Sequence, residues 1–98
     1  MSDRSLFELH GQTAAVTGSS SGIGRAVALE LAAAGAAVVV HARRSVERAE
    51  ETVEAIKRGG GNAFLILGDV GSPDDGPRLV EGAWDWRGSI DVWVNNAG

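Results

Sequence analysis

The sequence is 98 residues long, carries a formal net charge of −4 at pH 7 and contains no cysteine. This length allows one domain at most; the missing cysteines exclude a disulfide framework and a thiolate metal site, and the negative charge disfavours nucleic acid as a partner. No apolar run is long enough to cross a membrane and residues 1–5 lack the features of a signal peptide, so we expect a cytoplasmic protein.

The first strand and the first helix are predicted on either side of a glycine-rich turn. Residues 12–17 form an apolar strand, and a helix is expected from about residue 22 to residue 34, where Gly35 ends it. The apolar positions of this helix lie four residues apart on one face: Ile23, Val27 and Leu31.

The second strand is predicted at residues 36–41, a run of apolar and β-branched residues without polar alternation. Strands buried on both faces of a parallel sheet have this pattern. Ser45 is expected to cap the next helix, and the glycines at 59–61 to end it. The expected buried positions of that helix are Val46, Ala49, Val53 and Ile56. Its acidic residues form a solvated face rather than a metal site.

The last three elements complete the alternation. Residues 64–67 predict a third buried strand, and residues 90–94 a fourth. Between them, Ser72 and Pro73 are expected to begin a helix that runs to about Arg87. The expected buried side of that helix consists of Leu79, Val80, Ala83 and Trp84.

Alternating strands and helices with short connections predict an α/β fold. We expect a Rossmann-type parallel sheet of order 3-2-1-4, flanked by helices, which is an incomplete doubly wound fold. Residues 1–98 would form the N-terminal dinucleotide-binding half of a single Rossmann domain. Ligands of such sheets bind at the carboxyl ends of the strands, near the switch point between strands one and four.

The turn Thr17–Gly24 carries the main functional signal. Gly18 and Gly22 can adopt backbone angles closed to other residues, and Gly24 lets the helix pack close to the strand. The helix N-terminus favours an anion such as a pyrophosphate. A tight turn without a ligand is the alternative, but the strand, turn, helix and second strand follow one another as a dinucleotide site requires. The expected cofactor-binding residues here are Gly18, Ser19, Ser20, Ser21, Gly22, Ile23 and Gly24.

The end of the second strand indicates which dinucleotide is bound. Dinucleotide folds usually carry an acidic residue there, which binds the ribose hydroxyls and repels a 2′-phosphate. This sequence has Ala42 followed by Arg43 and Arg44. Guanidinium groups hold phosphates through paired, charge-assisted hydrogen bonds, so we expect both arginines to bind the cofactor and to favour NADP(H) over NAD(H). Two solvated arginines at a helix start are the alternative.

The Gly-x-x-x-Gly-x-Gly spacing of the turn, together with Asn-Asn-Ala-Gly at residues 95–98, resembles the short-chain dehydrogenase/reductase family over residues 7–98. The resemblance implies that Asp69 and Val70 contact the adenine and that Asn95 ties strands together. It also implies that the last residues border the nicotinamide ribose: Asn95, Asn96, Ala97 and Gly98. Without the resemblance, Asp69 is equally well interpreted as a helix cap and the asparagines as turn residues.

The resemblance further implies an oxidoreductase that transfers hydride between the cofactor and a carbonyl or alcohol substrate, and a homo-oligomer in the complete protein. The family's catalytic tyrosine, lysine and serine follow the Asn-Asn-Ala-Gly motif. This sequence contains no tyrosine, its lysine, Lys57, belongs to the second helix, and residues 19–21 belong to the turn. We therefore assign no catalytic residue and expect the catalytic half to be absent from this chain.

Other interpretations stay open at this stage. A stand-alone nucleotide-binding or regulatory module is one, and another Rossmann enzyme such as a methyltransferase is a second, which the turn spacing disfavours.

His10 and His41 have no second ligand at metal spacing, so no metal site is expected. His41 ends a strand on the adenine side, where it could stack or form hydrogen bonds. The tryptophans are expected to pack in the core and on helix surfaces: Trp84, Trp86 and Trp93.

Overall fold

Strands and helices alternate along the chain in the order that the sequence predicts. The computed structural model describes residues 9, 11–20, 22–69, 73, 75–88 and 90–96. Its elements are β1 (Thr13–Val16), α2 (Gly22–Ala33), β2 (Ala37–Ala42), α3 (Val46–Arg58), β3 (Ala63–Leu67), α4 (Asp75–Arg87) and β4 (Val92–Val94). Every expected element is therefore present, with small shifts at its ends.

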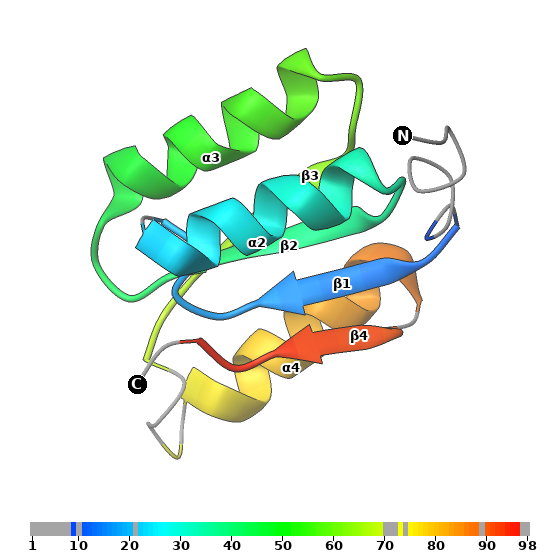
Figure 1. The fold of residues 1–98 in the computed structure, drawn as a ribbon. Coiled ribbons are helices and arrows are strands. Elements are labelled where there is room, and N and C mark those ends of the chain that lie inside the picture. Colours follow the sequence, from blue (N-terminus) through cyan, green and yellow to red (C-terminus); the bar gives the residue numbers. More distant parts are fainter. Residues whose placement is uncertain are drawn as a thin grey trace.

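The four strands form one parallel sheet in the order β3-β2-β1-β4, which confirms the predicted topology. In this register Val16 of β1 lies between Val40 of β2 and Val94 of β4. Helices α2 and α3 cover one face of the sheet, and α4 lies on the other (Figure 1). The turn after β1 consequently lies at the switch point, where the chain order across the sheet reverses.

The main core lies between the sheet and the helices α2 and α3. Every residue of β1 and β2 is buried, which confirms that β2 is covered on both faces. Val38 and Val40 are fully buried in this core, and burial of such a side chain stabilises the fold by about 1.5–3 kcal/mol. The two central strands are thereby fixed in place, together with the loops at their carboxyl ends.

The buried face of α2 differs from the predicted one in its first turn. Ile23 is 75% exposed, whereas Gly24 and Ala28 are the buried residues of this helix. Val27 and Leu31 pack against the core, partly buried, as expected. Because Gly24 faces the turn after β1, the neighbouring Ile23 side chain points away from the protein.

Helix α3 also departs from its apolar pattern. Its buried residues are Ala49, Thr52 and Ile56. Val46 is exposed because it lies in the first turn, whereas Thr52 is fully buried. The one hydroxyl proton of Thr52 is shared between the carbonyl oxygens of Ser19, 3.1 Å away, and Arg48, 3.2 Å away. Val53 packs against the core, partly buried. Ser45 precedes the helix as predicted, but its side chain makes no capping hydrogen bond.

Glycines end α2 and α3 as predicted, whereas α4 begins two residues later than expected. Gly35 and Gly60 adopt φ values of +102° and +88° after α2 and α3, so the predicted glycine stops are confirmed. Helix α4 begins at Asp75 rather than at Pro73. Pro77 therefore lies in the first turn, where backbone N–H groups have no helical partner and proline is tolerated.

Strand β3 is less buried than predicted. Phe64 and Leu67 are exposed, because β3 lies at the edge of the sheet and pairs with β2 alone within the described sheet. The Phe64 ring stacks on Trp86 of α4 with ring centroids 5.2 Å apart. Trp84 is exposed, against the prediction. Outside the described residues lie Ser72 and the side chains of Leu79, Val80 and Ala83.

Candidate functional site

The turn between β1 and α2 has the backbone that its glycines predict. The φ angle is +63° at Gly18 and +61° at Gly22, in the left-handed region that favours glycine. The N–H groups of the first turn of α2 have no partner within the helix, and the helix dipole adds partial positive charge there. This end of the helix is therefore suited to an anion. Ser21 lies outside the described residues.

Gly24 lies where α2, the turn and the end of β4 meet. A Cβ at this position would collide with the Gly18 carbonyl oxygen and would lie 2.6 Å from Asn96 Nδ2. Any side chain there would displace backbone, so the predicted close packing at Gly24 is confirmed. The shape of the turn is fixed by this contact between three segments.

Ser19 is directed into the protein. Its side chain is fully buried, and its Oγ donates to the Val16 carbonyl oxygen at 2.7 Å and accepts from His41 N at 2.8 Å. Its backbone N–H donates to the His41 carbonyl oxygen, and its own carbonyl oxygen accepts from Thr52 Oγ1. Ser19 thus fastens the turn to β2 and α3, while Ser20 beside it is half-buried.

The asparagines after β4 have different partners. The Asn96 backbone N–H donates to Thr17 Oγ1 at 2.8 Å, and its Nδ2 donates to the Gly18 carbonyl oxygen at 3.2 Å. Asn95 Oδ1 accepts from Trp93 Nε1 at the surface. The tie between strands that was expected of Asn95 is therefore made by Asn96. Ala97 and Gly98 lie outside the described residues.

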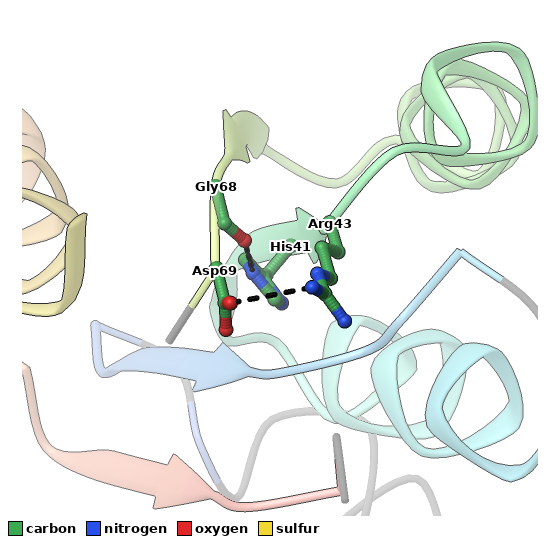
Figure 2. A network of polar contacts seen from close by, with 4 residues as sticks. All are labelled: His41, Arg43, Gly68 and Asp69. Carbon is green, nitrogen blue, oxygen red and sulfur yellow. Dashed lines mark hydrogen bonds and ion pairs between the residues drawn. The ribbon is translucent and has the colours of Figure 1, made fainter. Parts of the chain in front are cut away.

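Charged side chains meet where β2 and β3 end. Arg43 Nη2 lies 3.5 Å from Asp69 Oδ2, with the two side chains 62% and 41% exposed (Figure 2). Arg44 is also exposed. Ala42, in contrast, is 1% exposed and belongs to the main core, so the first position accessible to a ligand after β2 is Arg43. Val70 lies outside the described residues.

His41 connects the two halves of this region. Its ring is buried, and the Gly18 N–H group lies 2.9 Å from Nδ1. On the other side of the ring, the Gly68 carbonyl oxygen lies 2.7 Å from Nε2, the contact drawn in Figure 2. The sequence indicated hydrogen bonding by His41 only as one option. The signal was the polar side chain at the end of an otherwise apolar strand.

The described part of the chain has neither a metal-binding cluster nor a membrane-spanning helix. No group of three or more His, Asp or Glu side chains is placed there to hold a metal ion. None of the helices described is both long and apolar enough to cross a membrane.

Comparison with known proteins gives a consistent result. The family model described as short chain dehydrogenase matches residues 12–98. Among curated proteins, the short-chain dehydrogenase/reductase homolog YusS of Bacillus subtilis is 45% identical over 84 residues, which are 86% of this chain and 77% of that protein. Versicolorin reductase stcU of Emericella nidulans is 42% identical over 98 residues, the whole of this chain but 37% of that protein.

Solved structures agree on the fold. A hydroxysteroid dehydrogenase from Escherichia coli matches with a TM-score of 0.89 and 36% identity over 99% of this chain and 40% of that one. A short chain dehydrogenase from Burkholderia cenocepacia, in complex with NADP, matches with a TM-score of 0.88 and 41% identity over 92% of this chain and 37% of that one. Apart from YusS, this chain thus spans 40% or less of the relatives named here.

Proposed function

This chain belongs to the short-chain dehydrogenase family, and from that premise we propose that it is the NADP(H)-binding portion of an oxidoreductase acting on a carbonyl or alcohol. The bound nicotinamide would supply or accept the hydride. Residues 1–98 would form the N-terminal half of one Rossmann domain, with the catalytic half outside this chain. The complete protein would be a cytoplasmic homo-oligomer.

The observation that carries this proposal is the turn between β1 and α2. Left-handed backbone at Gly18 and Gly22 shapes the turn, and the close contact at Gly24 holds α2 against it. The space beside Gly22 is open, which leaves the helix N-terminus accessible to a diphosphate. Ile23 is exposed on the first turn of this helix, at the position where it could contact the ligand. We assign the pyrophosphate to this turn, with Ser19 holding the turn in shape from within.

The preference for NADP(H) rests on Arg43. It is the first exposed residue after β2, no carboxylate precedes it at Ala42, and its guanidinium lies 3.5 Å from the Asp69 carboxylate. An exposed ion pair of this kind is worth about 0–1 kcal/mol. A charge-assisted hydrogen bond to a 2′-phosphate is worth about 1.5–3 kcal/mol, so Arg43 can exchange one partner for the other at a net gain.

The remaining assignments follow the family motifs. Asp69 and Val70 would contact the adenine, and Arg44 would add positive charge beside the ribose. The stretch after β4 would border the nicotinamide ribose: Asn95, Asn96, Ala97 and Gly98. The Asn96 side chain holds the Gly18 carbonyl oxygen, which places this stretch against the turn that would carry the pyrophosphate.

Equilibrium titration of the complete protein with NADPH and NADH tests the proposal. We expect both dinucleotides to bind and NADPH to bind more tightly. Inclusion of 2′,5′-ADP and 5′-AMP as competitors separates the contribution of the 2′-phosphate from that of the adenosine. If neither dinucleotide binds, the proposal is overturned. If the two bind with equal affinity, only the preference for NADPH is overturned.

A second candidate function is a nucleotide-binding module without catalysis. The observation that favours it is the match to YusS, a relative of which this chain covers 77%. The two candidates differ in turnover. Oxidation of NADPH by the complete protein with a panel of ketones and quinones supports the oxidoreductase, whereas binding without turnover across the panel supports the module.

A further inference from the structure

His41 lies at the end of β2 with only 5% of its surface exposed. Its ring spans the space between the turn after β1 and the residue that follows β3. The Gly18 N–H group lies 2.9 Å from Nδ1. The Gly68 carbonyl oxygen lies 2.7 Å from Nε2, and Figure 2 shows this second contact. Each ring nitrogen therefore has a backbone partner that can act only as a hydrogen-bond donor or only as an acceptor.

These partners permit one form of the ring. A backbone N–H group can only donate, so Nδ1 must offer a lone pair. A carbonyl oxygen can only accept, so Nε2 must carry the proton. The other neutral tautomer would place donor against donor at Gly18 and acceptor against acceptor at Gly68. An imidazolium would lose the bond to Gly18.

The backbone of His41 reinforces the same connection. Its N–H donates to Ser19 Oγ at 2.8 Å, and its carbonyl oxygen accepts from the Ser19 N–H at 2.8 Å. The N–H groups of Gly18 and Ser19 are thus both directed into the protein. An anion at the turn would have to be met by N–H groups further along, at the start of α2.

The other side of the ring fixes the loop after β3. Gly68 donates its N–H to the Ala42 carbonyl oxygen at 3.1 Å and presents its carbonyl oxygen to His41. The next residue is Asp69, which lies 3.5 Å from Arg43. One imidazole therefore joins the turn assigned to the pyrophosphate with the loop assigned to the adenine and the 2′-phosphate.

We propose that His41, as the neutral Nε2–H tautomer, is a positioning residue that sets the spacing between these two parts of the dinucleotide site. The inference rests on the proposed function, because it concerns the same site. It assigns His41 no contact with the cofactor. Its effect would be transmitted through Gly18 on one side and Gly68 on the other.

Three variants separate the two contacts. In His41→Asn the shorter side chain can still accept from Gly18, in His41→Gln the longer one can donate to Gly68, and in His41→Leu neither bond can form. We expect His41→Leu to weaken NADPH binding about tenfold, which corresponds to about 1.4 kcal/mol. The asparagine and glutamine variants should each recover part of that loss.

The ligand series distinguishes positioning from general destabilisation. The affinity for 2′-AMP, which has the adenine and the 2′-phosphate but lacks the 5′-phosphate that the turn would hold, should fall less in His41→Leu than the affinity for NADPH. The matched control is Val38→Ala, because Val38 is fully buried in the same strand and lies in the core. That control should lower the free energy of unfolding and leave the Kd for NADPH of the folded protein unchanged.

Nitrogen-15 NMR of the His41 ring tests the tautomer without any ligand. In the neutral ring a protonated Nε2 and an unprotonated Nδ1 are expected; an Nδ1–H tautomer would overturn the inference, whether or not the variants fold. Wild-type affinity for NADPH in folded His41→Leu would overturn the inference alone. Failure of the wild-type protein to bind either dinucleotide would overturn the proposed function and this role of His41 together.

Discussion

Replacement of Arg43 by aspartate is expected to reverse the cofactor preference of the complete protein. Arg43 is the first exposed residue after β2, so a carboxylate there would repel a 2′-phosphate and offer acceptors to free ribose hydroxyls. Each charge-assisted hydrogen bond lost costs about 1.5–3 kcal/mol. A loss of about 2.7 kcal/mol corresponds to a hundredfold rise in the Kd for NADPH.

The structure also limits the effect of this substitution on stability. The Arg43–Asp69 pair is exposed on both sides and contributes about 0–1 kcal/mol. Two carboxylates 4 Å apart in water repel by about 1 kcal/mol. The protein should therefore stay folded. Ala42→Asp would place its charge in the core, where burial costs several kcal/mol, and should destabilise the fold instead of switching the cofactor.

Fluorescence titration with NADPH and NADH at one fixed salt concentration measures the preference as a ratio of two Kd values. Arg58→Asp is the charge-matched control, because Arg58 is exposed at the opposite end of α3. The ratio should change about a hundredfold or more in Arg43→Asp and should stay near the wild-type value in the control. An unchanged ratio in Arg43→Asp, or equal changes in both variants, would refute the assignment of Arg43.

Three further outcomes are expected. Gly24→Ala should lower the free energy of unfolding by about 1–3 kcal/mol and abolish tight NADPH binding, because the new Cβ collides with the Gly18 carbonyl oxygen; denaturation and titration that both match the wild type would contradict this. Asn96→Ala should cost about 0.5–1.5 kcal/mol in chemical denaturation, because it removes the bond that joins the end of β4 to Gly18, whereas Asn95→Ala removes a contact between residues two apart and should cost less; a reversed order would be inconsistent with the tie assigned to Asn96. The purified 98-residue chain, which has no tyrosine, should oxidise NADPH only at background rate with ketones and quinones, and sustained turnover would show that this reasoning is wrong.

The fold could be predicted because its signals are local. The buried strand β2 is a continuous apolar run, the turn after β1 is marked by Gly18 and Gly22, and helices α2 and α3 end at glycines. Each of these features depends on neighbours within a few residues. Alternating elements then leave few topologies, because crossovers between parallel strands are right-handed.

The errors arose where distant segments decide the outcome. Ile23 is exposed because Gly24 faces the turn. Thr52 is buried although it is polar, because its hydroxyl reaches the Ser19 carbonyl oxygen. Phe64 is exposed because β3 is an edge strand. Apolar periodicity along a single helix or strand contains none of this information.

The sequence predicts which residues belong to the site better than it predicts what each of them does. The glycine pattern indicated the turn, but not that Ser19 faces inward or that His41 connects two loops. Nor could the sequence distinguish Asn96 from Asn95, since the tie depends on a partner 78 residues away in the chain. Such roles are set by hydrogen bonds across the sheet.

The bond between Asn96 and Gly18 has a consequence for the order of folding. It closes a segment of 78 residues, and the entropy lost in closing such a loop amounts to about 4 kcal/mol plus a constant. That cost is recovered only when β4 docks beside β1, so contacts of long range must form before the turn acquires its final shape. During synthesis, the residues of β1, α2 and β2 would emerge well before residue 96. The nascent chain would become competent to bind a dinucleotide only after residue 96 has emerged.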